Sequence, residues 1–260
     1  MRRVALLCAV LVGVGSSGAS AQEPLEPGAF GALGMYPKRL SCSDVPTYSA
    51  PRPAHRLASA HEGDARLRRA YSAPDTLAIP GGTSVGLQVG QQFFVRRLLI
   101  SPSRQKPSTS SPGMVHTAGW ITIVGADDFA ALARIDHACD GFMKGDFLEA
   151  FTAAPMPAAV ASPGPQKFED MGQLLFGNDG RRSFANGDIV VINRGAQHGV
   201  TAGARLGIFR DVKSGGPLVP VGHAIVLTVG EDTATVIADR VRDALASGDW
   251  VGLQDVATRP

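Results

Sequence analysis

The sequence predicts a mostly β protein of two tandem small β-barrel or sandwich-like repeats, preceded by a proline-rich N-terminal arm. One observation behind this is an internal repeat, because residues 73–97 align with 186–210 without a gap at a constant offset of 113. Another is that the apolar runs of both repeats are short and bounded by glycine or Asx residues, as strands are. Since an internal repeat reveals the architecture before any motif does, we expect two structural units of the same kind.

The N-terminal residues 1–21, MRRVALLCAVLVGVGSSGASA, have the pattern of a secretory signal peptide. Arg2 and Arg3 precede an apolar run that is shorter than the about 20 residues needed to span a membrane. The small residues at 19–21 predict cleavage after Ala21. We therefore expect an exported protein of the periplasm or cell envelope, soluble after cleavage and without stable membrane insertion.

The charge of the chain is balanced. It carries 25 basic and 23 acidic residues, and loss of Arg2 and Arg3 with the signal peptide would leave 23 of each. A protein without excess positive charge has no field that would neutralise phosphate groups. We therefore expect no nucleic-acid partner.

Two cysteines, Cys42 and Cys139, lie beyond the signal peptide. Disulfides persist in the compartment that the signal peptide implies, so we expect these two residues to pair. In the chain-entropy model, a closed loop of about 100 residues stabilises the fold by roughly 4–5 kcal/mol. Two separate buried thiols are the alternative.

Composition divides the rest of the chain. Proline, serine and alanine dominate the expected arm at 22–72 and the expected linker at 153–183, and a tail follows at 256–260. The first repeat is expected at 73–152, with strands at 75–79, 92–97, 119–124, 129–135 and 146–151. The second is expected at 184–255, with strands at 188–193, 205–210, 222–229, 233–239 and 249–254.

Three of the six identical positions in the aligned stretches are glycines. We expect them to bend the chain between strands, where a positive φ or a close backbone approach excludes a Cβ atom. A phosphate-binding loop would need a helix after the glycines, whereas here a strand follows. The structural turn glycines are Gly82, Gly86 and Gly90 in the first repeat and Gly195, Gly199 and Gly203 in the second. Gly-Asp pairs at 145–146, 187–188 and 248–249 are expected to begin strands.

One stretch, GTSVG at 82–86, matches the G-x-S-x-G pattern of serine hydrolases. That nucleophile elbow needs a strand, a sharp turn and then a helix, but the residues after Ser84 favour a strand. Gln197 also stands at the position of Ser84 in the second repeat. A chance match is therefore favoured, and a serine hydrolase that uses Ser84 with a histidine is kept as an alternative.

Other polar candidates show no catalytic or ligand spacing. His137 and Cys139 could form a metal pair on an extended segment, although a disulfide explains Cys139 better. The acidic pairs 127–128 and 231–232 lie in expected hairpin turns, where carboxylates are ordinary, so glycosidase chemistry is the weaker interpretation. We expect no catalytic residue, no cofactor and no metal. The histidines considered are His116, His137, His198 and His223.

Aromatic residues are expected mainly in the core, and a glycan-binding surface on Trp120 or Trp250 is an alternative. The loops 101–119 and 211–222 differ most between the repeats, so a binding face is expected there. The repeats share their glycines but no evident polar constellation, which favours a conserved fold over repeated chemistry.

The stretch GDIVVINRGAQHGVTAGARLGIFR, with the later VGEDTATVIAD and GDWV, resembles the C-terminal domain of flagellar assembly protein T. The same small β-domain is similar to domains of exported bacterial proteins that carry LysM modules. The resemblance implies a non-catalytic envelope module that binds envelope proteins or peptidoglycan. The sequence contains no LysM module and lacks the tripartite flagellar layout, so no role in flagella is implied. We therefore expect an exported, non-enzymatic interaction or scaffold protein.

Overall fold

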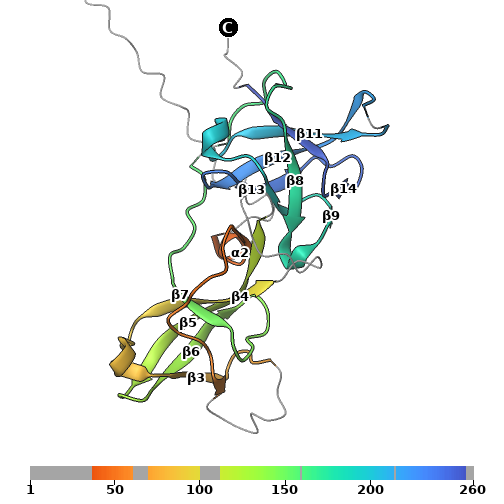
Figure 1. Cartoon of the computed structure of the whole chain (residues 1–260). Coiled ribbons are helices and arrows are strands. Elements are labelled where there is room, and N and C mark those ends of the chain that lie inside the picture. Colours follow the sequence, from red (N-terminus) through yellow and green to blue (C-terminus); the bar gives the residue numbers. More distant parts are fainter. Residues whose placement is uncertain (1–36, 61–69, 100–111, 159, 214, 256–260) are drawn as a thin grey trace, which may run out of the picture.

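The computed structural model describes residues 37–60, 70–99, 112–158, 160–213 and 215–255. The expected signal peptide, residues 101–111 of the expected binding loop and the tail at 256–260 lie outside these ranges. In the described ranges, no helix has the length and apolar character needed to cross a membrane. The chain is mostly β, as predicted, and its strands form two separate antiparallel sheet systems, which we call unit one and unit two (Figure 1).

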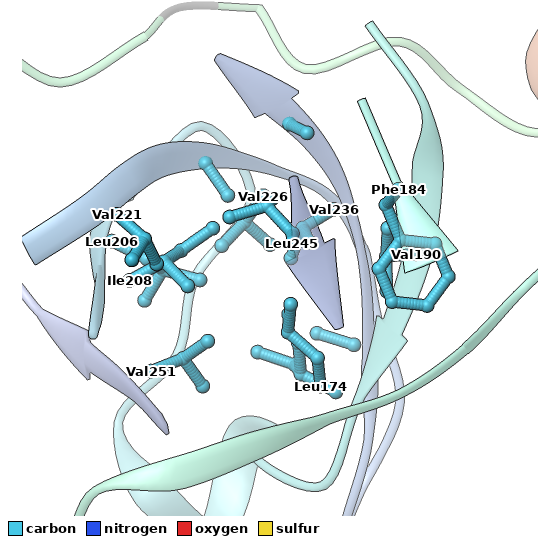
Figure 2. Packing of buried hydrophobic residues seen from close by; sticks show 14 of the residues in the cluster. Leu174, Phe184, Val190, Leu206, Ile208, Val221, Val226, Val236, Leu245 and Val251 are labelled. Carbon is cyan, nitrogen blue, oxygen red and sulfur yellow. The ribbon is translucent and has the colours of Figure 1, made fainter. Parts of the chain in front are cut away.

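Unit two is a closed barrel with the strand order β10-β13-β12-β11-β15-β8. Period-2 alternation places Val190 and Ile192 in the barrel interior, whereas Ile189 packs on its outer side. Figure 2 shows how branched aliphatic side chains from the surrounding strands fill this interior. The strands are β8 (Gly172–Gly177), β10 (Ile189–Ile192), β11 (Arg205–Asp211), β12 (Leu218–Val229), β13 (Ala234–Asp239) and β15 (Trp250–Leu253), with a small separate pair of β9 (Ser183–Phe184) and β14 (Leu245–Ala246).

Unit one is a seven-stranded sheet with the order β2-β3-β6-β5-β4-β7, to which β1 adds by pairing with β5. Its core contains Leu77, Ile79, Val95, Ile121 and Phe142. All five strands expected in each repeat are present. The strands of unit one are β1 (Val45–Thr47), β2 (Ser59–Ala60), β3 (Thr76–Pro80), β4 (Gln92–Leu99), β5 (Gly113–Ala126), β6 (Ala130–Ala138) and β7 (Phe147–Ala150).

Both units begin earlier than the sequence indicated. The expected linker at 153–183 contains β8, which closes the barrel, so the linker is shorter than predicted. Leu174 of β8 donates its N–H to the Asp249 carbonyl at 2.9 Å, and Leu57, within the expected arm, donates to the Asp146 carbonyl at 2.8 Å. These two segments therefore occupy the same place in their units. The repeat alignment missed them because HRLASA at 55–60 and GQLLFG at 172–177 share little beyond one leucine, at a different offset.

The arm contacts both units. Its short helix α2 (Pro37–Ser41) places Leu40 on the outer side of the unit-two barrel, in a buried cluster with Val160, Ile225, Leu227 and Ile237. The predicted disulfide between Cys42 and Cys139 is present and joins the arm to the residue after β6 of unit one. Because one end of this segment packs on unit two and the other is bonded to unit one, the arm links the two units.

The aligned glycines occupy equivalent turns. A Cβ atom on Gly82 would lie 1.8 Å from the Asp127 carbonyl oxygen, and one on Gly195 would lie 2.5 Å from the Glu231 carbonyl oxygen. Gly86 and its partner Gly199 adopt left-handed conformations with φ of 86° and 73°. Gly82 and Gly195 thus allow a close backbone approach, whereas Gly86 and Gly199 supply a turn that L-residues disfavour. The remaining aligned pair, Gly90 and Gly203, also has positive φ.

Candidate functional site

An arginine–aspartate pair recurs in the two units. Arg97 of β4 donates from Nε and Nη2 to the two carboxylate oxygens of Asp146, at 3.1 and 3.0 Å. Arg210 of β11 does the same with Asp249, at 2.9 and 2.7 Å. The inference that the repeats share no polar constellation is therefore wrong. Sequence motifs could not reveal this arginine–aspartate pair, because its two residues lie about 40 to 50 residues apart in sequence. They meet only across neighbouring strands.

These pairs fix the turns that precede β7 and β15. Each aspartate also accepts a backbone N–H, from Met143 to Asp146 and from Ala246 to Asp249, both at 2.8 Å. The same arginines donate to backbone carbonyls of Gly141 and Ala244, at 2.5 and 2.6 Å. All these partners belong to the fold, so the repeated pair is structural.

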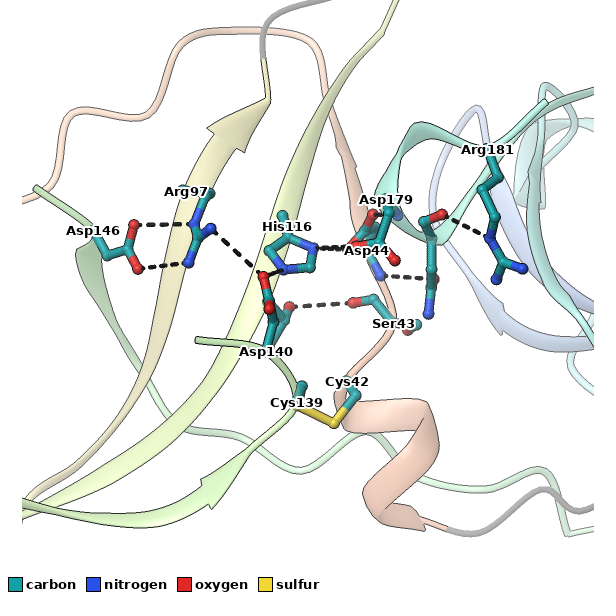
Figure 3. A network of polar contacts seen from close by, with 12 residues as sticks. Cys42, Ser43, Asp44, Arg97, His116, Cys139, Asp140, Asp146, Asp179 and Arg181 are labelled. Carbon is teal, nitrogen blue, oxygen red and sulfur yellow. Dashed lines mark hydrogen bonds and ion pairs between the residues drawn. A yellow bond between two sulfur atoms is a disulfide. The ribbon is translucent and has the colours of Figure 1, made fainter. Parts of the chain in front are cut away.

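A second polar cluster lies where the arm and unit two meet unit one (Figure 3). His116 lies on β5, and its Nδ1 atom is 2.9 Å from Asp44 Oδ1 and 3.3 Å from Asp179 Oδ1. Its Nε2 atom is 3.2 Å from Asp140 Oδ2. Asp44 belongs to the arm and Asp179 to the 3₁₀ turn η2 (Asn178–Gly180) of unit two. We call these four residues the joint, because they connect three parts of the chain.

The joint is buried on one side and open on the other. The side chains of His116 and Asp44 are 8% and 1% exposed, whereas those of Asp140 and Asp179 are more than half exposed. A hydrogen bond to Asp44 raises the pKa of His116, the charges of Asp44 and Asp179 raise it further, and burial and the nearby Arg97 oppose the shift. Asp44 Oδ2 also accepts the Asp179 N–H at 2.8 Å. The buried carboxylate is thus fully hydrogen-bonded, as burial requires.

A cleft of about 520 Å³ adjoins the joint and the disulfide. His137 lines it and stacks against Trp120, with ring centroids 4.5 Å apart. Cys42 and Cys139 lie near His137, but both sulfur atoms are in the disulfide. The oxidised Cys139 therefore has no thiolate to bind a metal together with His137.

A second cleft, of about 300 Å³, lies between the units and is lined by Phe94 and Arg96 on one side and by residues 228–231 on the other. Arg96 packs over the Phe94 ring at 4.4 Å and pairs with Glu149 at 3.2 Å. Burial lowers the pKa of Arg96. Its Nε atom has no hydrogen-bond partner among the described residues.

Ser84 lies in the 3₁₀ turn η1 (Gly82–Val85) and not at a strand-to-helix elbow. Its hydroxyl donates to the Gly81 carbonyl at 2.5 Å. No described histidine is hydrogen-bonded to it, and the chain continues into β4 (Gln92–Leu99). The structure therefore does not bring together a serine, a base and an oxyanion site at this position.

The remaining polar candidates are separated and serve local structure. His198 Nδ1 lies 3.2 Å from the Gly195 nitrogen, and His223 Nδ1 lies 3.3 Å from Gln254 Nε2. Asp127 accepts the N–H groups of Ala130 and Phe129 in the β5–β6 turn, and these bonds lower the pKa of Asp127. In the second acidic pair, Glu231 accepts a hydrogen bond from Gln197 at 2.8 Å.

Of the two tryptophans, Trp120 is 8% exposed and packs against Phe94, Phe151 and His137. A sugar ring cannot stack on a face that is covered in this way, so the structure does not support Trp120 as a glycan platform. Trp250 is only half-buried.

Exposed apolar side chains gather at one end of unit one, a feature that the sequence did not predict. Phe129 in the β5–β6 turn is 85% exposed, and its carbonyl accepts the Gly81 N–H next to η1. Val85 in η1, Val89 and Val124 are each 45–64% exposed. Backbone hydrogen bonds from Thr83 to Asp127 and from Gly90 to Ile123 place them at the same end of unit one. We call Val85, Val89, Val124 and Phe129 the apolar end. Short apolar runs in a sequence predict which strands form a core. They do not show which apolar residues of a turn remain outside that core.

Neither a scan against protein-family models nor a search of curated proteins finds a match to this chain. The resemblance of the second repeat to the C-terminal domain of flagellar assembly protein T therefore stays a prediction.

Proposed function

We propose that this protein is an exported, non-catalytic scaffold of the cell envelope that binds a partner protein through the apolar end of unit one. The observation that carries the proposal is the exposure of Phe129, which is greater than that of any other large apolar residue in the described chain. Contiguous exposed apolar surface on a soluble protein commonly marks a binding site, because leaving it in water is unfavourable.

The repeat supplies an internal comparison for the apolar end. The Asp127 carbonyl accepts the Thr83 N–H, and the Gly230 carbonyl accepts the Ala196 N–H, so the two turns are equivalent. Two residues further on, unit one has Phe129 where unit two has Asp232. The fold therefore does not require an aromatic residue at this turn, which supports a binding role for Phe129.

The chemistry of the apolar end favours a protein over a polysaccharide. Glycan sites use flat aromatic faces with adjacent polar groups, but Trp120 is covered, and the exposed groups here are three valines and one phenylalanine. Asp127 and Asp128 border these side chains in the same turn. A partner with an apolar hollow and basic residues at its rim would complement this surface.

The arm and linker support a scaffold role. Leu40 and Val160 are buried on the outside of unit two, and the disulfide fixes Cys42 to unit one. A partner held at unit one would therefore be held at a defined place relative to unit two.

The proposal can be tested with Phe129→Asp, which gives unit one the residue type of unit two. Val212→Asp is the matched control, because Val212 is also exposed and lies between β11 and β12 of unit two. The whole protein and both variants are immobilised and exposed to envelope extract. The proteins that they retain are identified, purified and titrated against each variant. Purified peptidoglycan sacculi serve as a parallel bait.

We expect a discrete partner whose purified form binds the wild type and Val212→Asp equally and binds Phe129→Asp at least about tenfold more weakly, a loss of roughly 1.4 kcal/mol. Equal binding by all three proteins would contradict the role of the apolar end. Retention by sacculi alone, lost on Trp250→Ala, would replace the proposal with glycan binding.

A further inference from the structure

Three electron-pair donors converge at the joint, the Nδ1 atom of His116 and one carboxylate oxygen each from Asp44 and Asp179. His116 Nδ1 carries at most one proton, yet carboxylate oxygens of Asp44 and Asp179 approach it at 2.9 and 3.3 Å. All three ligand atoms lie within 4.8 Å of one another. Two carboxylates that share one imidazole proton repel each other, and a cation between the three atoms would remove that repulsion.

The other side of the imidazole ring provides an independent observation. Asp140 Oδ2 lies 3.2 Å from His116 Nε2, so this carboxylate can hold the proton on Nε2 and leave the Nδ1 lone pair directed toward Asp44 and Asp179. Histidines that bind metals almost always donate their second N–H to such a carboxylate, carbonyl or water. Asp140 is thus placed as the outer partner of a metal ligand.

We propose that Asp44, His116 and Asp179 bind a divalent transition-metal ion of the zinc class, with Asp140 as the residue that orients the histidine. Zinc is bound by imidazole nitrogen and carboxylate oxygen at about 2.0–2.2 Å, which puts ligand atoms of a tetrahedral site roughly 3.4 Å apart. The two separations from Nδ1, 2.9 and 3.3 Å, lie near this value, and the Asp44 and Asp179 ligand atoms lie within 4.8 Å of each other. Mg²⁺ and Ca²⁺ are disfavoured because they prefer oxygen ligands alone.

The surroundings of the joint suit such an ion. Three protein ligands leave a fourth position, and the adjoining cleft of about 520 Å³, which Asp179 and His116 line, has room for a water molecule there. Asp44 is almost fully buried and would be a fixed ligand, whereas the exposed Asp179 would close the site from unit two. The metal would therefore bind the arm, unit one and unit two to one another.

A protonated imidazole that bridges the carboxylates is the competing account, and the two can be separated by direct binding. The whole, untagged protein is stripped with EDTA, freed of chelator under non-reducing conditions and titrated with Zn²⁺ by calorimetry. Asp179→Asn tests the site with a change of little volume at an exposed side chain. Asp243→Asn is the matched control, because Asp243 has nearly the same exposure, 68% against 67%, and also makes one ion pair.

We expect one Zn²⁺ per chain, with affinity retained in Asp243→Asn and reduced at least about tenfold in Asp179→Asn, as changes around metal sites commonly do. Nitrogen NMR of the imidazole should show Zn²⁺ shifting Nδ1 of His116 and not Nε2. Circular dichroism of Asp179→Asn establishes that the variant is folded. No binding by the wild type, or equal binding by Asp179→Asn, would overturn the proposal. Its failure would leave the role of the apolar end untouched, since the two surfaces share no residue.

Discussion

The carboxylate of Asp249 accepts two hydrogen bonds from the guanidinium of Arg210, at 2.9 and 2.7 Å, and in doing so joins the end of β11 to the turn before β15. The equivalent pair in unit one is Arg97 with Asp146. The internal repeat therefore preserves a polar clamp as well as turn glycines. Since every partner of the clamp is a turn or strand of its own unit, its contribution is to stability.

Asp249→Asn should destabilise the protein strongly. The Asp249 side chain is 6% exposed, and the substitution leaves the Arg210 charge without its main partner. Hydrogen bonds to charged groups contribute about 1.5–3 kcal/mol, so we expect a loss of about 2–3 kcal/mol in the free energy of unfolding measured with urea. Asp243→Asn, which removes a mostly exposed partner of the same arginine, should cost less than about 1 kcal/mol. Equal losses would contradict the account.

The repeat and its strands could be predicted because both rest on local patterns. Glycine spacing and short apolar runs are visible in any window of the sequence, and every expected strand is present. The segment around Leu57 in unit one and strand β8 in unit two could not be predicted, because their pairing depends on residues far away in the sequence: Leu57 bonds to Asp146, and Leu174 bonds to Asp249. The pairing of Cys42 with Cys139 was predicted from compartment and cysteine count, and it is present.

The turn glycines should differ in their tolerance of alanine. A Cβ atom at Gly82 would overlap the Asp127 carbonyl at 1.8 Å, whereas one at Gly86 would meet no atom within 4 Å. Gly86→Ala should therefore cost only the left-handed conformation, about 1–2 kcal/mol in urea unfolding. Gly82→Ala should cost clearly more, because backbone must move. A smaller loss for Gly82→Ala than for Gly86→Ala would show that the close approach is not required.

Removal of the disulfide should destabilise the protein and release the arm. The bond closes a separation of 97 residues, for which the chain-entropy model gives about 4–5 kcal/mol. The double variant Cys42→Ser with Cys139→Ser should show this loss in urea unfolding and faster amide exchange in residues 37–47. An unchanged unfolding midpoint would mean that the packing of Leu40 and β1 is sufficient to hold the arm.

The metal-free joint should be more stabilising at low pH than at high pH. The pKa of His116 is raised in the folded protein, mainly by Asp44, while Asp140, Asp179 and Arg97 also face the ring. The charged histidine therefore stabilises the fold fully below its unfolded pKa of about 6.5, and this contribution is lost as pH rises through the folded pKa. In EDTA, the stability difference between wild type and His116→Gln should shrink from about pH 6 toward higher pH. A difference that grows over that range would contradict the assignment.

The candidate sites were less predictable than the fold. His116 was identified as a candidate, but its partners Asp44, Asp140 and Asp179 come from three segments that only the tertiary structure brings together. The sequence FAALARI predicts a strand that includes Phe129, whereas β6 begins one residue later, at Ala130. For the GTSVG motif, the glycines and apolar residues after Ser84 favour a strand over a helix, and the structure places Ser84 in η1 ahead of β4.

Binding of a partner protein at the apolar end can be tested by placing a photoreactive amino acid at Val89 and, in a second protein, at Val212 of unit two. Both side chains are 64% exposed, so the probes start from equal accessibility. After irradiation with envelope extract, we expect a discrete crosslinked partner from position 89 that is absent from position 212. The same products from both positions, or none from position 89, would contradict the claim that this end of unit one binds a protein.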